Sequence, residues 1–245
     1  MGLFDRFGPK GREARILKKH GARVANRRAQ NVDRWDSIRA LSSLGSPEAV
    51  EALLRRFTFR VDPSITDQEE KDAAFQAVVA VGEDAVPSVV HALRRDPSIA
   101  WPLKCLEQLV SEEELVGILL GLLSDMSTEY ERDPDRKIQV LGILEEHSDP
   151  RIASAVLPFL EDVNETARFH AVGTLLAQPN AETASKELFA RLGQDDSLRL
   201  RVKLLDGFID SNWAVPDSVI AAVRENIPSG YHVSTSGKIS RGGAV

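Results

Sequence analysis

Two runs of acidic residues carry the side chains that general acid–base catalysis needs. They are Glu112–Glu114 and Glu145–Glu146. A catalytic acid and base must flank the same bond, whereas adjacent residues on an α-helix point about 100° apart. We therefore interpret both runs as solvated helix surface rather than as catalytic pairs.

The histidines and glycines do not form a known ligand or phosphate-binding motif. No histidine has a second His, Cys or carboxylate at the i, i+3 or i+4 spacing of a zinc site. The histidines are His20, His91, His147, His170 and His232. The sequence also lacks Gly-x-Gly-x-x-Gly and Gly-x-Ser-x-Gly motifs. We therefore predict a protein without catalytic residues, metal or cofactor.

The elements that would position any site are helices arranged in pairs. Between Ile38 and Leu54, apolar residues recur at helical spacing, stop at Gly45 and then resume. Because glycine readily takes the positive φ that ends a helix, this stretch predicts a helical hairpin. The pattern recurs about every 29 to 37 residues. The predicted pairs are 38–44 with 47–54, 73–81 with 85–93, 103–110 with 114–123, 138–144 with 151–160, 169–176 with 181–192, and 202–209 with 215–223.

Residues at the helix ends support these boundaries. Ser46 and Asp149 each place an N-cap acceptor directly before a proline, which fits the first position of a helix. Pro158 lies too far inside its predicted helix for that placement. We therefore expect Pro158 to kink the helix or to mark a late start.

The first hairpin resembles a HEAT repeat, particularly the bacterial HEAT-like type first noted in phycobilisome lyases. Its residues 40–54 read Ala-Leu-Ser-Ser-Leu-Gly-Ser-Pro-Glu-Ala-Val-Glu-Ala-Leu-Leu. The resemblance covers roughly residues 35–225 and implies an all-α fold, a right-handed α-solenoid of about six HEAT-like helical hairpins. It further implies a non-catalytic protein–protein interaction scaffold or adaptor. We divide the chain into a basic segment 1–34, a repeat region 35–228 and a C-terminal tail 229–245.

A basic residue recurs at one position in five of the six hairpins, about eleven residues before the break. The cations are Arg34, Lys71, Lys137, Arg168 and Arg201. A cation at a helix start opposes the helix dipole, so each needs a nearby anion. Acidic residues precede the cations, and Asp162 and Asp195 each lie six residues before one of them. We predict a structural ladder of ion pairs that bridges neighbouring hairpins. Each exposed pair would contribute little to stability. The alternative is that the cations form a phosphate-binding stripe.

Charge is distributed unevenly along the chain. Residues 1–34 have a net charge of +7, residues 229–245 have +2, and the repeat region between them has −15. An acidic repeat region predicts a protein partner with a basic surface and makes nucleic acid an improbable ligand. The basic segment either caps the first hairpin or docks on an anionic partner or lipid surface, so membrane association is expected only through residues 1–34.

Three features predict a cytoplasmic protein. Cys105 is the only cysteine, the first residues lack the apolar core of a signal peptide, and no apolar stretch is long enough to span a bilayer. We expect Cys105 to be a buried thiol.

Exposed residues on the first helix of each hairpin are the expected partner contacts. They are Gln76, Lys104, Gln108, Gln139, His170 and Lys203. The alternative is a HEAT-like alkylpurine DNA glycosylase, a class that uses aromatic residues and a carboxylate on a basic concave face. The matching residue types here are Trp35 with Asp33 or Asp36, Trp101, and Trp213 with Asp210. The negative charge of the repeat region argues against this alternative.

The C-terminal tail has a weak alternating pattern. Residues 231–240 alternate around Ser236–Gly237, which indicates either a small β-hairpin or a flexible tail. From Arg241 onward we expect a mobile end.

Overall fold

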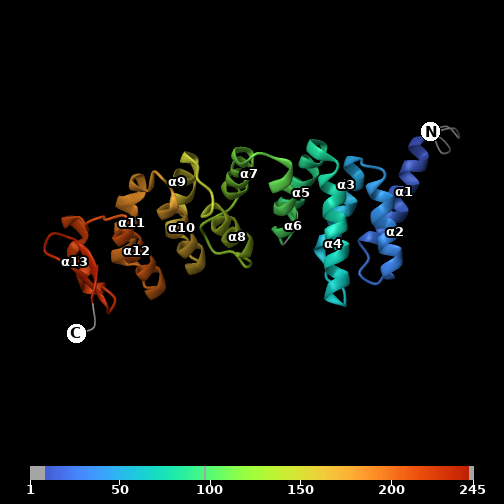
Figure 1. Cartoon of the computed structure of the whole chain (residues 1–245). Helices are drawn as coiled ribbons and strands as arrows, with labels where there is room; N and C mark the ends of the chain where they lie inside the picture. Colours follow the sequence, from blue (N-terminus) through green and yellow to red (C-terminus); the bar gives the residue numbers. More distant parts are fainter. Residues whose placement is uncertain (1–8, 97, 243–245) are drawn as a thin grey trace. The chain divides into compact units, whose positions relative to one another are not determined.

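The structure is a computed structural model that describes residues 9–96 and 98–242 (Figure 1). The regular structure of the described residues is helical apart from two short strands, so the all-α prediction is confirmed. The chain divides into two compact units, Met1–Leu115 and Val116–Val245, and each is described by itself.

The first unit consists of helices joined by short turns. Its helices are α1 (Pro9–Val24), α2 (Asn31–Ser42), α3 (Pro47–Leu54), α4 (Ser64–Val79), α5 (Val86–Arg95) and α6 (Ala100–Leu109), with the 3-10 segments η2 (Arg55–Thr58) and η3 (Gly82–Ala85). Helix α7 (Glu112–Ser124) includes the point of division between the units.

The second unit ends in a small sheet. Its elements are α8 (Asp135–Leu144), α9 (Pro150–Val156), η4 (Leu157–Glu161), α10 (Glu165–Ala177), η5 (Ala181–Ala184), α11 (Ser185–Gln194), α12 (Leu198–Asp210), α13 (Asp217–Asn226), β1 (Tyr231–Val233) and β2 (Ile239–Arg241). Each of the six predicted helical pairs corresponds to two successive helices, from α2 with α3 to α12 with α13.

The turns within the hairpins follow from local chemistry. Gly45, Gly82 and Asn212 have φ values of +59°, +75° and +53°, in the left-handed region that ends a helix. The Ser46 hydroxyl accepts a hydrogen bond from the Ala49 N–H, which caps α3. Pro158 lies in the first turn of η4, where α9 has already ended, so the proline marks a change of helix type.

Within each unit the helices form two layers. In the first unit α2 packs on α4 and α4 on α6, while α3 packs on α1 and α5. In the second unit α10 packs between α8 and α12, while α11 contacts η4 and α13. The apolar side chains between the layers are buried, and a fully buried leucine such as Leu141 or Leu204 contributes about 1.5–3 kcal/mol.

The C-terminal tail forms the β-hairpin rather than a flexible end. Strand β1 pairs antiparallel with β2, and β2 contacts α12. The expectation that Arg241 is mobile is wrong, because its guanidinium lies 2.7 Å from the Asp206 carboxylate of α12. Residues 243–245, to which the same expectation applied, lie outside the described residues.

No single helix among the described residues is both long and apolar enough to cross a bilayer. Helix α4 and the segment Gly82–Arg95 are long and apolar enough to span a bilayer only when they are taken together. The chain bends by 116° where they join.

Candidate functional site

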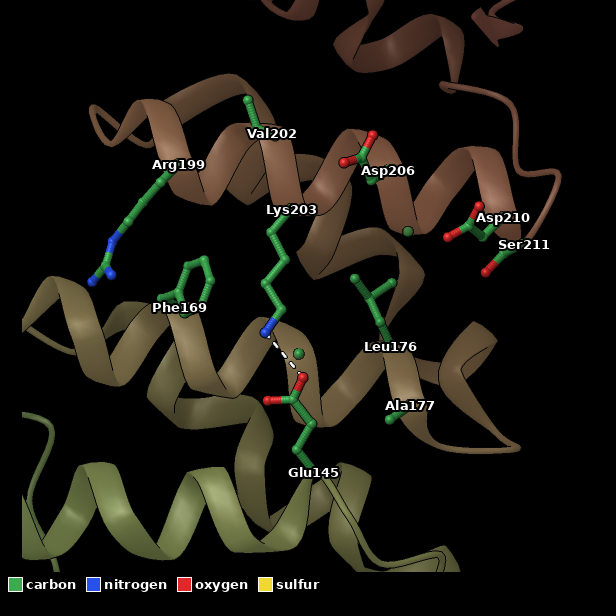
Figure 2. A pocket seen from close by; sticks show the side chains of 12 residues that line it. Glu145, Phe169, Leu176, Ala177, Arg199, Val202, Lys203, Asp206, Asp210 and Ser211 are labelled. Carbon is green, nitrogen blue, oxygen red and sulfur yellow. Dashed lines mark hydrogen bonds and ion pairs between the residues drawn. The ribbon is translucent and has the colours of Figure 1, made fainter. Parts of the chain in front are cut away.

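A groove of about 510 Å³ lies between α10 and α12 in the second unit (Figure 2). Leu176 and Ala177 of α10 and Val202 and Gly207 of α12 supply its apolar surface. Gly207 lets the two helices approach closely, because a Cβ at that position would collide with the Leu176 side chain. The charged lining residues are Glu145, Arg199, Lys203, Asp206 and Asp210.

Lys203 is held across the groove by two neighbours. Its ammonium lies 3.0 Å from Glu145 Oε1 and 4.2 Å from the centre of the Phe169 ring. Figure 2 shows the side chain crossing from α12 toward Glu145 at the end of α8. The crossing needs Gly173 on α10, where an added Cβ would collide with both the ammonium and the Glu145 carboxylate. Lys203 is thus fixed in place as part of the groove wall.

Arg199 occupies the other side of the same aromatic ring. Its guanidinium carbon is 4.6 Å from the centre of Phe169, and its Nε donates to Glu165 Oε1 at 2.8 Å. The hydrogen bond from Arg199 is the main cause that lowers the pKa of Glu165 to about 2. Each cation–ring contact contributes about 0.5–1 kcal/mol at a solvent-accessible site. This end of the groove therefore presents two ordered cations.

His170 lies beside this cluster without a hydrogen bond to its Nδ1 among the described residues. That nitrogen is 3.7 Å from Glu145 Oε2, which is too long for a hydrogen bond. Burial lowers the pKa of His170 below its ordinary value, and the Lys203 ammonium lowers it further against the opposing effect of Glu145. The imidazole is therefore favoured in its neutral form.

Replacing Lys203 by Met is expected to raise the pKa of His170. The substitution removes a cation that opposes protonation and releases Glu145 from its ion pair. Titration of the imidazole by NMR measures the effect. Lys186→Met, which removes an exposed lysine that does not line the groove, is the matched control and should leave the titration unchanged. A pKa that stays constant or falls in Lys203→Met would contradict this description of the cluster.

The opposite end of the groove is acidic. Asp206 Oδ1 accepts hydrogen bonds from the Tyr231 hydroxyl at 2.6 Å and from Arg241 at 2.7 Å. Asp210 is exposed and has no ion pair among the described residues. Figure 2 shows Asp206 and Asp210 on successive turns of α12, beyond Lys203. A positively charged group of a ligand would find an uncompensated carboxylate at this end.

The recurring cations mostly lie against carboxylates of the next hairpin, and these carboxylates are buried. Arg34 Nε is 2.8 Å from Glu70, Lys137 is 2.7 Å from Asp162, and Arg168 is 2.8 Å from Asp195. The expectation of exposed pairs is wrong for Arg34 and Lys137, since both partners of the Lys137–Asp162 pair are only about 1% exposed. Arg168 is half-buried. Burial raises the energetic cost of losing either partner alone.

Two positions of the series have different partners. Lys71 is 2.7 Å from Asp67 of its own helix, and Arg201 donates to the Asn226 carbonyl rather than to a carboxylate. Arg56 was not foreseen, although its fully buried guanidinium contacts both Asp67 and Glu70 at 2.7 Å. Arg55 and Arg56 both stand between Leu54 and Phe57, so no sequence signal distinguished the buried Arg56 from the exposed Arg55.

Glu70 is the centre of this buried network. Its carboxylate accepts hydrogen bonds from Arg34, Arg56 and Asn31. Burial by itself raises the pKa of Glu70, but these hydrogen bonds outweigh it and the pKa lies below its ordinary value. The same balance lowers the pKa of Asp67 and Asp195. Glu70 is therefore ionised near neutral pH.

The predicted contact residues fall into two separate groups. In the first unit Gln76, Lys104 and Gln108 are exposed, and the Lys104 ammonium lies 4.8 Å from the centres of the Phe75 and Trp101 rings. In the second unit His170 and Lys203 meet at Glu145. Gln139 is half-buried on α8 and does not line the groove.

The tryptophans lie in packed positions. Trp101 stacks on Phe57 with ring centres 4.9 Å apart, and Trp213 packs on Phe208 and Phe189. Trp35 is half-buried beside Arg39.

Burial raises the pKa of the Cys105 thiol to about 12. Within residues 9–96 and 98–242, no group of three or more His, Cys, Asp or Glu side chains is placed to hold a metal ion.

No protein-family model, no curated protein sequence and no solved structure matches this chain.

Proposed function

We propose that this protein is a non-catalytic scaffold, a HEAT-like α-solenoid that binds a protein partner through the groove between α10 and α12. The groove carries the proposal because it combines an open apolar surface with charged groups fixed at both ends. Such preorganised surfaces bind without a large ordering cost.

The chemistry of the groove selects a partner segment with a basic side chain. The aliphatic stem of a lysine or arginine would lie on Leu176 and Ala177, and its charged head would reach Asp210. An acidic residue of the same segment would face Lys203 and Arg199. The negative charge of the repeat region favours a partner with a basic surface, because complementary charge speeds encounter and rejects acidic competitors. We place this interaction in the cytoplasm.

Site-specific photo-crosslinking tests the proposal in living cells. Ala177 is exposed within the groove, so a benzoylphenylalanine placed there should crosslink to a defined protein partner. Ser154 is equally exposed, but it lies on α9 and does not line the groove. The same photoreactive residue at position 154 is the matched control and should give no such product.

A further inference from the structure

The outer face of α1 carries a stripe of cations. Arg12, Arg15, Lys18 and Lys19 are exposed on this helix, and Arg27 and Arg28 continue the stripe in the turn that follows. We call these six residues the α1 basic face. At 100° per residue, the four helical members lie within about 120° of one another around the axis. They therefore project from one side of the helix.

The opposite side of α1 fixes it to the first unit. Helix α1 packs against α2 and α3, as the neighbouring ribbons in Figure 1 also show. Val24 is fully buried and Gly21 lies against Ala52. Arg23, at the edge of the basic face, forms an ion pair with Asp33 of α2 at 3.2 Å. The predicted alternatives of cap and docking arm are therefore compatible, because one face of the helix is packed and the other is exposed.

The cations of the α1 basic face have no carboxylate partner among the described residues. None of the six forms an ion pair there, and Glu13 is the only acidic residue in α1. Burial is the main cause that lowers the pKa of the neighbouring His20, and Lys19 and Arg23 lower it further against the opposing effect of Asp36. Unpaired like charges on one ridge repel one another, and a polyanion would remove that repulsion.

We propose that the α1 basic face docks on an anionic lipid bilayer. Clusters of about four to eight Lys or Arg on a helix surface are typical of attraction to anionic headgroups. The other exposed residues of α1 are Lys10, Ala14 and Ala22, so the helix presents no exposed aromatic side chain on which a nucleic-acid base could stack.

Co-sedimentation of the full chain with vesicles tests this proposal. The protein is expected to bind vesicles of phosphatidylcholine with about one-third phosphatidylserine and not vesicles of phosphatidylcholine alone. Binding should be released at about 0.5 M salt, because the interaction is electrostatic. The variant Arg12→Gln, Arg15→Gln, Lys18→Gln, Lys19→Gln is expected to bind the anionic vesicles about 600-fold more weakly, since each of the four cations near the surface contributes about five-fold.

A variant with the same change in net charge distinguishes an effect of the α1 basic face from an effect of net charge alone. Arg55→Gln, Arg60→Gln, Arg132→Gln, Lys186→Gln removes four exposed cations elsewhere and should retain vesicle binding. Far-UV circular dichroism confirms that both variants are folded. The proposal is overturned if the wild-type protein does not bind anionic vesicles, or if it binds a labelled DNA duplex but not vesicles. It is also overturned if the two variants lose vesicle binding equally.

Discussion

Replacing Glu70 by Ala is expected to lower the free energy of unfolding by about 3–5 kcal/mol, because it leaves the buried Arg34 without a carboxylate and removes one of the two carboxylates that Arg56 contacts. Arg34 is 4% exposed and Arg56 is fully buried, so water cannot replace the lost partner. The change also removes the acceptor for the Asn31 side chain at 2.7 Å. Urea denaturation followed by far-UV circular dichroism measures the loss.

Glu69→Ala is the matched control for this experiment. Glu69 precedes Glu70 on α4 but is exposed and forms no ion pair among the described residues. Its replacement should change the free energy of unfolding by no more than about 0.5 kcal/mol. Equal effects of the two substitutions would show that the network around Glu70 does not stabilise the first unit.

The second large effect is expected at the buried pair of the second unit. Lys137→Met should lower the free energy of unfolding by about 3–5 kcal/mol, because Asp162 would remain as a buried, uncompensated charge. The two charged groups are 2.7 Å apart, and Lys137 also donates to the Ser127 carbonyl. Arg132→Met, at an exposed position nearby in the sequence, is the control and should have little effect.

A double variant separates loss of the ion pair from loss of packing. Lys137→Met, Asp162→Asn removes both charges and keeps the Oδ1 acceptor that the Asn164 N–H uses. It is expected to be more stable than Lys137→Met alone, because no buried charge remains unpaired. The single variant Asp162→Asn completes the cycle, and a double variant whose loss equals the sum of the two single losses would mean that the two charges do not interact.

The helical pairs could be predicted because their signals are local. Apolar spacing of 3.6 residues, the Ser46 and Asp149 caps, and the break at Gly82 each depend on residues close in sequence. The recurring cations were visible for the same reason. The burial of these cations could not be predicted, since it depends on how one hairpin packs on the next.

The groove could not be predicted because it depends on contacts between helices. Gly173 looks like an unfavourable residue inside a helix, and only the structure shows that it makes room for Lys203 and Glu145. Glu145 and Lys203 are 58 residues apart, and no local pattern joins them. His170 and Lys203 were named as contact residues, but Phe169, Arg199 and Asp206 were not.

The central proposal is that a protein partner occupies the groove between α10 and α12, and the crosslinking contrast tests it most directly. We predict a single partner product from position 177, none from position 154, and loss of the product when Asp210→Lys is added to the protein labelled at 177. Charge reversal at Asp210 would repel the basic side chain of the partner. A partner product of equal yield at position 154, or one that survives Asp210→Lys unchanged, would contradict the proposal.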